Sequence, residues 1–449
     1  MEQNLYMDIL SLAAQMMLSL SLLVILHECG HFFPARWFNT KVEKFYLFFN
    51  PYFSLFKKKI GDTEYGIGWV PFGGYVKIAG MIDESMDKEQ LKQPPQPWEF
   101  RSKKAWQRLI IMVGGVTVNF ILGFIIFGGL LYYYGKTYIP TQNLTSGIYV
   151  DSLGAAIGLE NGDHIRKIGE EDFTKFNTGA LIEGIVINDA QTITVERNGQ
   201  EVQIPVDPKW AGYLSKQGRK PSNIIGIMHP IDLAKVSEGS VGDEMGLQEE
   251  DRLISVNGIS TPYLFKLQEE LRKSKGQSVT IGLLRGGDTL NVSGQLGEEA
   301  VLGIQSYGYD KYFEIAREKY TLAQAIPGGV NEGMGFLGKQ LKAFGQMFKG
   351  RIKATESLGS VISITKLFDP GWSWERFWTI TAMLSILLGF FNLLPIPALD
   401  GGYIMFLFYE MISGRKPSDK FLEYATVAGF ILMVGLMIFA LGLDISRLF

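Results

Sequence analysis

The hydrophobic positions of the chain concentrate in four long runs that carry almost no charge. They cover about residues 9–33, 109–134, 377–399 and 424–443. Each run has the roughly 20 apolar residues that a helix needs to cross the hydrocarbon of a bilayer. The pattern predicts a polytopic α-helical membrane protein with four transmembrane helices, and the 47% hydrophobic content fits a chain that is part membrane and part soluble.

Short loops rich in lysine and arginine predict the orientation of these helices. The loop between the first two helices and the loop between the last two are basic, whereas the N-terminal stub has no basic residue; the loop residues are Lys41, Lys44, Lys57, Lys58, Lys59, Lys103, Lys104, Arg108, Arg415, Lys416 and Lys420. Basic loops stay in the cytoplasm, and long domains cross largely regardless of charge. Both termini and the stretch 135–376 are therefore expected on the extracytoplasmic side.

An internal repeat divides this stretch into two modules. Residues 158–163 read G-L-E-N-G-D and residues 246–251 read G-L-Q-E-E-D, and alternating strand patterns with a hairpin turn follow each of them. The repeat predicts two tandem α/β modules, at 142–210 and 222–298. The turn resembles the G-L-x-x-G-D mark of PDZ domains, from which Glu250 departs. PDZ domains bind peptides by strand addition, so peptide ligands are one interpretation and modules without a ligand are the other.

Residues 299–375 form a linker that contains one amphipathic segment. Apolar residues keep helical spacing from 321 to 349, and the opposite face carries lysine and glutamine. Such a helix either lies in the membrane interface or packs against a module. The glycines within it weaken the prediction of one unbroken helix.

Charge and cysteine content exclude further classes of protein and bond. The formal net charge is -3, which gives no case for nucleic-acid binding. Cys29 is the single cysteine, so the chain can form no internal disulfide.

Candidate chemistry appears at the inner end of the first predicted helix, where residues 27–31 read H-E-C-G-H. Residues four apart share one face of a helix, so His27 and His31 can bind one metal ion. Glu28 lies one step round the helix, where a carboxylate can accept a proton from a water at the metal. An ionisable cluster at membrane depth is functional by default because it is costly there. The alternative is a pair of interfacial histidines that cap a membrane helix.

A catalytic zinc takes three protein ligands and a water, so one ligand is still missing. The third run ends N-L-L-P-I-P-A-L-D-G-G over residues 392–402. Its two prolines cannot continue a regular helix, and irregular backbone at membrane depth needs protein or a water-filled cavity around it. Asp400, directly after this break, is the candidate third ligand; a simple helix cap is its alternative. His164 and His229 fall in the predicted outer modules.

The two motifs together, H-E-x-x-H on the first membrane helix and N-x-x-P-x-P-x-L-D-G at the end of the third, resemble the site-2 protease family of intramembrane zinc metalloproteases. Two PDZ-like modules between the second and third helices resemble the bacterial, RseP-like branch of that family. The resemblance implies a Zn2+ cofactor held by His27, His31 and Asp400, with Glu28 as the general base. It also implies that Asn392 is catalytic and binds the substrate backbone by a hydrogen bond.

Residues 61–80 share this resemblance, with V-P-F-G-G-Y-V-K at 70–77. In the family this stretch is a membrane re-entrant β-hairpin that clamps the substrate strand, so Gly73 and Gly74 are candidate substrate-binding residues. Asn119 lies in the second helix, where the family has G-P-x-x-N-F. This chain has G-V-T-V-N-F there and lacks the proline.

The resemblance implies membrane regions at 1–141 and 376–449 in the bacterial cytoplasmic (inner) membrane. The implied activity is regulated intramembrane proteolysis: cleavage of single-pass membrane proteins, such as an anti-sigma factor or remnant signal peptides, after a first extracytoplasmic cut. The partners are then these substrates and the lipid bilayer. A non-proteolytic scaffold and a metal transporter are the competing interpretations. The intact Glu28 argues against the first, and transporters usually show repeated membrane halves, which this sequence lacks.

Overall fold

The computed structural model describes residues 2–81, 94–215, 224–357 and 359–447. The chain divides into two compact units. The membrane unit comprises Met1–Gly135, Lys319–Leu341 and Ser357–Phe449, and the module unit comprises Lys136–Glu318 and Lys342–Glu356.

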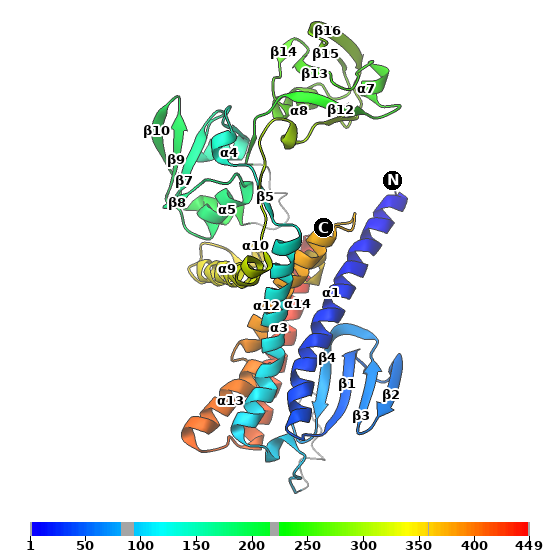
Figure 1. Cartoon of the computed structure of the whole chain (residues 1–449), viewed down its shortest axis with the longest axis vertical. Helices are drawn as coiled ribbons and strands as arrows, with labels where there is room; N and C mark the ends of the chain where they lie inside the picture. The colour runs from blue at the N-terminus through cyan, green and yellow to red at the C-terminus, as the bar shows by residue number, and fades with distance from the viewer. Residues whose placement is uncertain (1, 82–93, 216–223, 358, 448–449) are drawn as a thin grey trace. The chain divides into compact units, whose positions relative to one another are not determined.

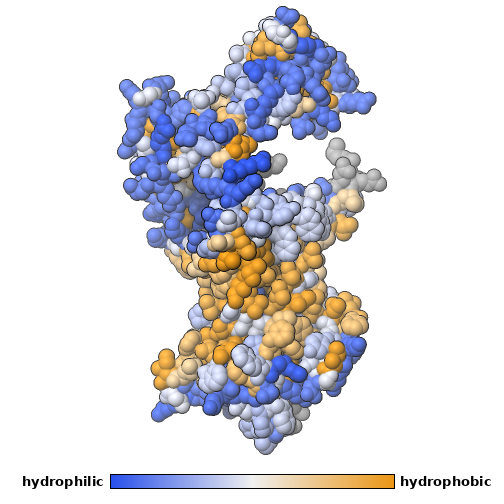
Figure 2. Space-filling model, in the orientation of Figure 1, coloured by the Kyte–Doolittle hydropathy of each residue, from blue (hydrophilic) through white to orange (hydrophobic). Residues whose placement is uncertain are grey.

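Among the described residues of the membrane unit, four helices are long and apolar enough to cross a bilayer, as the hydrophobic runs predict. They are α1 (Glu2–Trp37), α3 (Ala105–Tyr133), α12 (Trp374–Leu393) and α14 (Asp419–Ser446). On the face that Figure 2 shows, hydrophobic side chains form a band over these helices, with hydrophilic side chains below it. Helix α3 packs against both α1 and α12. Glycines allow the first of these contacts, because a Cβ on Gly30 would lie 2.5 Å from the carbonyl oxygen of Gly114.

The third membrane helix is shorter than predicted, and a further helix follows it. Helix α12 ends at Leu393, before the predicted end at 399, because Leu394 is extended and the two prolines follow directly. The irregular segment predicted from the prolines is therefore present. Helix α13 (Asp400–Ser413) begins at Asp400 and was not predicted from the sequence.

A four-stranded sheet in the order β2-β3-β1-β4 lies beside α1 (Figure 1). Its strands are β1 (Val42–Phe49), β2 (Phe56–Ile60), β3 (Thr63–Ile67) and β4 (Val70–Ile78). Strand β4 forms one edge of the sheet and packs against α1.

This sheet corrects the hairpin expected over 61–80. Strand β3 pairs with β1 in parallel and β4 pairs with β1 in antiparallel, so β3 and β4 lie on opposite sides of β1. The chain crosses the end of β1 at Gly68, whose amide donates to the Leu47 carbonyl. A side chain on Gly68 would collide with the Phe49 carbonyl, so glycine permits this crossing.

The module unit contains two α/β modules of similar element order. The first consists of β6 (Ile148–Val150), α4 (Ser152–Ile157), β7 (His164–Ile168), β8 (Glu171–Asp172), α5 (Thr178–Val186), β9 (Thr192–Arg197), β10 (Gln200–Pro205) and β11 (Ile225–Ile227). The second consists of β12 (Ile231–Val236), α7 (Val241–Glu244), β13 (Arg252–Val256), β14 (Ile259–Ser260), α8 (Leu264–Lys273), β15 (Ser278–Arg285), β16 (Asp288–Gln295) and β17 (Ile304–Ser306). Strand β5 (Lys136–Tyr138) pairs with β18 (Ala316–Glu318).

Each module is completed by a strand that follows its hairpin in the sequence. Strand β11 pairs with β6, and β17 pairs with β12. The sequence grouped Ile225 with the second module, but its side chain is buried in the hydrophobic core of the first. The repeat marks only the turn and the hairpin, so it does not reveal this pairing.

The repeated turn has the same support in both modules. The Arg197 Nε donates to Asp163 Oδ1 at 2.8 Å, and the Arg285 Nε donates to Asp251 Oδ1 at 2.6 Å. Both aspartates are buried, and the hydrogen bond to each raises the pKa of its arginine. Glu250, the departure from glycine, has a φ of +68° in the left-handed region that side chains rarely adopt.

The amphipathic segment is one helix, α9 (Leu322–Phe348), despite its glycines. The side chains of Leu322, Ile326 and Met334 are exposed. Near the end of the helix, Lys342 donates to Asn188 of the first module at 2.9 Å. Both interpretations of the segment therefore keep support. The remaining short elements are η1 (Phe100–Ser102), η2 (Thr141–Asn143), α6 (Lys209–Leu214), η3 (Tyr309–Lys311), α10 (Ala354–Ser357) and α11 (Val361–Thr365).

Candidate metal centre

Helix α1 positions the two histidines of the H-E-x-x-H motif. The motif lies in the last third of an uninterrupted helix, so His27 and His31 project from one face, one turn apart. Their Nε2 atoms are 3.2 Å apart, and both side chains are buried, as is that of Glu28. The helix therefore aims two imidazole nitrogens at one point.

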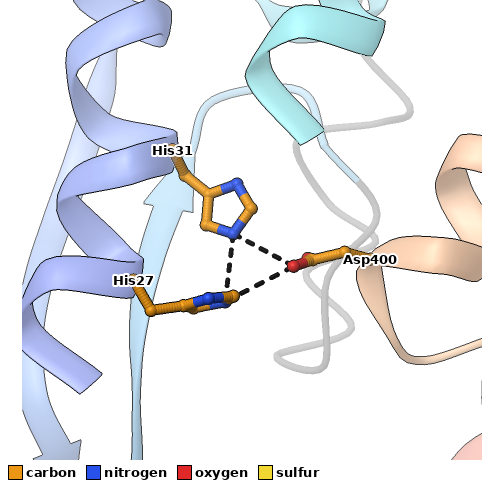
Figure 3. A group of neighbouring side chains, drawn as sticks. All are labelled: His27, His31 and Asp400. Carbon is orange, nitrogen blue, oxygen red and sulfur yellow. Dashed lines mark hydrogen bonds and ion pairs between the residues drawn. The ribbon is translucent and has the colours of Figure 1, made fainter. Parts of the chain in front are cut away.

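The start of α13 brings Asp400 to the same point (Figure 3). Its Oδ2 atom lies 3.4 Å from His27 Nε2 and 3.2 Å from His31 Nε2. This oxygen is buried and makes no hydrogen bond with the part of the chain that the structure describes. A buried carboxylate oxygen in this state is costly unless a cation or a donor satisfies it.

The spacing of these three atoms fits a zinc ion. Zinc bonds of about 2.0–2.1 Å to nitrogen or oxygen at tetrahedral angles separate neighbouring ligand atoms by about 3.3 Å. The observed separations of 3.2, 3.2 and 3.4 Å match that value. Two imidazoles and one carboxylate are also a ligand set that zinc accepts, with a fourth position left for water.

Helix α3 supplies hydrogen bonds behind the two histidines. The His31 Nδ1 lies 2.8 Å from the carbonyl oxygen of Ile111, so the ring donates to it when Nδ1 is protonated. The His27 Nδ1 lies 3.0 Å from the Asn119 carboxamide. Asn119 belongs to a motif that the sequence analysis noted, but its contact with His27 was not predicted, because this contact depends on how α3 packs on α1.

The edge strand β4 lies beside Glu28. A Cβ on Gly74 would lie 3.6 Å from Glu28 Cγ, so the strand backbone passes close to this side chain. Gly73 has a φ of +80° and faces the Phe49 ring instead. Of the two candidate glycines, the structure thus brings Gly74 to the centre, while Gly73 allows a backbone conformation in the strand.

Asn392 also reaches the centre, from the last turn of α12. Its Nδ2 atom is 3.5 Å from His27 Nε2, and its side chain is half-buried. The residues predicted from three distant segments thus lie together, whereas His164 and His229 lie in the module unit.

Comparisons with known proteins cover nearly the whole chain. The sequence profile described as peptidase family M50 matches residues 15–436. The "Putative zinc metalloprotease RC0203" of Rickettsia conorii is 28% identical over 443 residues, covering 96% of this chain and 98% of that protein. The regulator of sigma-E protease RseP of Escherichia coli is 27% identical over 459 residues, covering 97% of this chain and 98% of that protein. The regulator of sigma E protease of Haemophilus influenzae is 27% identical over 456 residues, with 96% and 98% covered.

Proposed function

Because this chain belongs to peptidase family M50, and is therefore a zinc metalloprotease of the membrane, we propose that it cuts peptide bonds within the transmembrane segments of single-pass membrane proteins. The observation that supports this most directly is the triangle of His27, His31 and Asp400 beside Glu28. This cluster is built on a helix that is long and apolar enough to span the bilayer. A protease that acted only outside the membrane would not need its cluster at that depth.

In this proposal His27, His31 and Asp400 hold the zinc ion. When bound, the ion supplies Lewis acidity for the activation of water. Asp400 brings the negative charge that offsets part of the charge of the ion, and the two imidazoles bind through Nε2. The break at 394–399 lets α12 end and α13 begin, so that Asp400 can face α1.

Glu28 is the proposed general base. Its buried carboxylate is adjacent in sequence to His27, and its Cγ lies beside Gly74 of β4. It would take the proton of the attacking water and later pass that proton to the leaving amine. Asn392, at 3.5 Å from His27 Nε2, would hold the substrate backbone near the cut by a hydrogen bond.

The β4 edge of the sheet is the proposed clamp for the substrate. A peptide bond within a helix is shielded and its amide is already paired, so the substrate must unwind before attack. An unwound segment can add to a sheet edge by main-chain hydrogen bonds. Strand β4 is that edge, and Gly74 brings its backbone next to Glu28.

The proposed substrates are an anti-sigma factor or remnant signal peptides, already cut once on the extracytoplasmic side. They fit an enzyme in the bacterial inner membrane with both termini and both modules outside, as the basic loops predict. The modules resemble PDZ domains in their repeated turn, and a peptide ligand for either is part of the proposal.

A cleavage assay in proteoliposomes tests the proposal. The full chain is reconstituted with a model single-pass substrate, and products are located by mass spectrometry. Glu28→Gln should lower the rate by about a hundred- to ten-thousand-fold while zinc content is kept. Asp400→Ala should lose zinc, and Cys29→Ala on the same helix should behave as wild type. Normal turnover by Glu28→Gln, or full zinc and activity in Asp400→Ala, would contradict the assigned roles.

A further inference from the structure

We propose that Asn119 is a positioning residue that accepts a hydrogen bond from the His27 ring and thereby strengthens zinc binding. The inference rests on the proposed function, in which His27 binds zinc through Nε2. It assigns a task to a side chain on α3 that contacts neither the ion nor the substrate in that proposal.

The surroundings of Asn119 are unusual for an amide within a membrane helix. Its side chain is fully buried, and its Nδ2 lies 3.0 Å from His27 Nδ1. Its Oδ1 is buried without a hydrogen-bond partner in the described parts of the chain. An amide buried this deeply is costly unless both of its ends are satisfied.

The tautomer of His27 determines which end of the Asn119 amide faces the ring. Since Nε2 of His27 points toward His31 and Asp400, a metal ion at that point leaves the ring proton on Nδ1. Nδ1–H is a donor and needs an acceptor, which an amide nitrogen is not. The oxygen and nitrogen of a carboxamide exchange places by rotation of the amide group. The zinc-bound form therefore has the Asn119 oxygen on the His27 Nδ1–H.

His31 has a corresponding contact at its Nδ1 atom, with a different acceptor. Its Nδ1 lies 2.8 Å from the Ile111 carbonyl oxygen. Ile111, Gly115 and Asn119 are spaced four residues apart on α3, so they form one stripe on the face toward α1. The stripe thus contacts the Nδ1 atom of both rings. His31 meets a backbone carbonyl, whereas His27 meets the Asn119 side chain, which a substitution can remove.

Two contacts from α12 lie at Asn119, and neither involves its carboxamide. The Ser385 hydroxyl on α12 donates to the Asn119 backbone carbonyl at 2.7 Å. A Cβ on Gly389 would lie 3.3 Å from the Asn119 Cβ. The carboxamide itself contacts the His27 ring, so its role as an acceptor can be tested separately from the packing of Asn119 on α12. Groups that orient a metal-bound histidine typically change metal affinity by 10–100-fold when they are removed.

Zinc affinity of the full-length protein in detergent tests the inference, measured by competition with a chromogenic chelator. Asn119→Leu keeps the approximate size of the side chain without an acceptor, and should weaken zinc binding by about 10–100-fold. Asn119→Asp keeps an acceptor and should bind zinc at least as tightly as wild type. Ser385→Ala removes only the bond to the Asn119 backbone and should leave zinc affinity within about twofold, a margin well inside the loss expected for the acceptor.

Two results would overturn the inference. One is a folded Asn119→Leu protein with wild-type zinc affinity. The other is weakened binding in Asn119→Asp, which tests the acceptor role even if Asn119→Leu does not fold. The absorption spectrum of the cobalt-substituted protein should shift in Asn119→Leu and not in Ser385→Ala. His27→Ala separates this inference from the proposed function: if that variant keeps full zinc affinity, the ligand assignment itself has failed.

Discussion

Gly115 gives the sharpest test of how the centre is built, because it has no side chain where both histidines need space. A Cβ at this position would lie 2.7 Å from His27 Cε1 and closer still to His31 Nε2. Ordinary contacts begin near 3.4 Å, so the His27 ring would have to retreat by about 0.7 Å. Metal ligands tolerate displacements of only about 0.2 Å. Gly115→Ala should therefore lower zinc affinity by at least about 100-fold.

The stability of the same variant should change little. Overpacking costs about 1–3 kcal/mol, and replacing glycine by alanine within a helix returns about 1 kcal/mol. The variant should therefore lose zinc affinity while its apo form stays folded. Thermal unfolding of the apo protein in detergent measures the second property.

Gly129 provides the matched control on the same helix. A Cβ there meets no atom within 4 Å, so Gly129→Ala should keep zinc affinity and activity and gain slightly in stability. Zinc affinity is measured for both variants by chelator competition. Wild-type zinc binding in a folded Gly115→Ala protein would refute the reasoning that α3 is shaped around the two rings.

Three further predictions concern the clamp and the modules. Val76→Pro removes a backbone donor on β4 and should impair cleavage without loss of zinc, while Val76→Ala should have a milder effect. Helix-breaking residues near the cut site of the substrate should partly restore cleavage by the proline variant. Equal cleavage rates in all of these assays would argue against the clamp. The hydrogen bond from Arg252 holds the pKa of Asp232 below its usual value, so its stabilisation is present above the unfolded pKa near 3.9 and disappears as pH falls through the folded value. Hydrogen exchange of β12 and β13 should therefore differ between wild type and Asp232→Asn at pH 7. The difference should disappear as the pH falls through the folded pKa of Asp232, and a difference that stays constant with pH would contradict this assignment. Asp251→Ala removes the buried carboxylate that accepts from Arg285. Because the Arg285 side chain is partly exposed, the second module should lose about 1–3 kcal/mol of stability, measured as loss of exchange protection in β13. An unchanged protection pattern would show that the pair is dispensable.

The sequence predicted the structural features that depend on residues close to one another in the chain. Runs of about 20 apolar residues announce membrane helices whatever packs beside them, because the bilayer sets their length. Helical periodicity places His27 and His31 on one face without knowledge of the fold. The paired prolines predicted the break before Asp400 because a ring without an amide proton ends a helix locally.

Other features follow from contacts between distant segments, which no local pattern records. The sequence could name Asp400 as a candidate, but only the packing of α13 near α1 brings its oxygen within 3.2 Å of His31 Nε2. The same is true of Asn119, whose contact with His27 exists because glycines let α3 approach α1. The expected hairpin became two strands on opposite sides of β1, since strand order depends on which edges meet in space. The repeat likewise predicted the turn of each module but not β11 or β17. These strands follow the hairpin in the sequence and lie outside the repeated pattern, so only their pairing in the fold assigns them to a module. Features that depend on local hydrogen bonding and on solvation can thus be predicted from the sequence. The metal centre cannot, because tertiary packing brings its residues together.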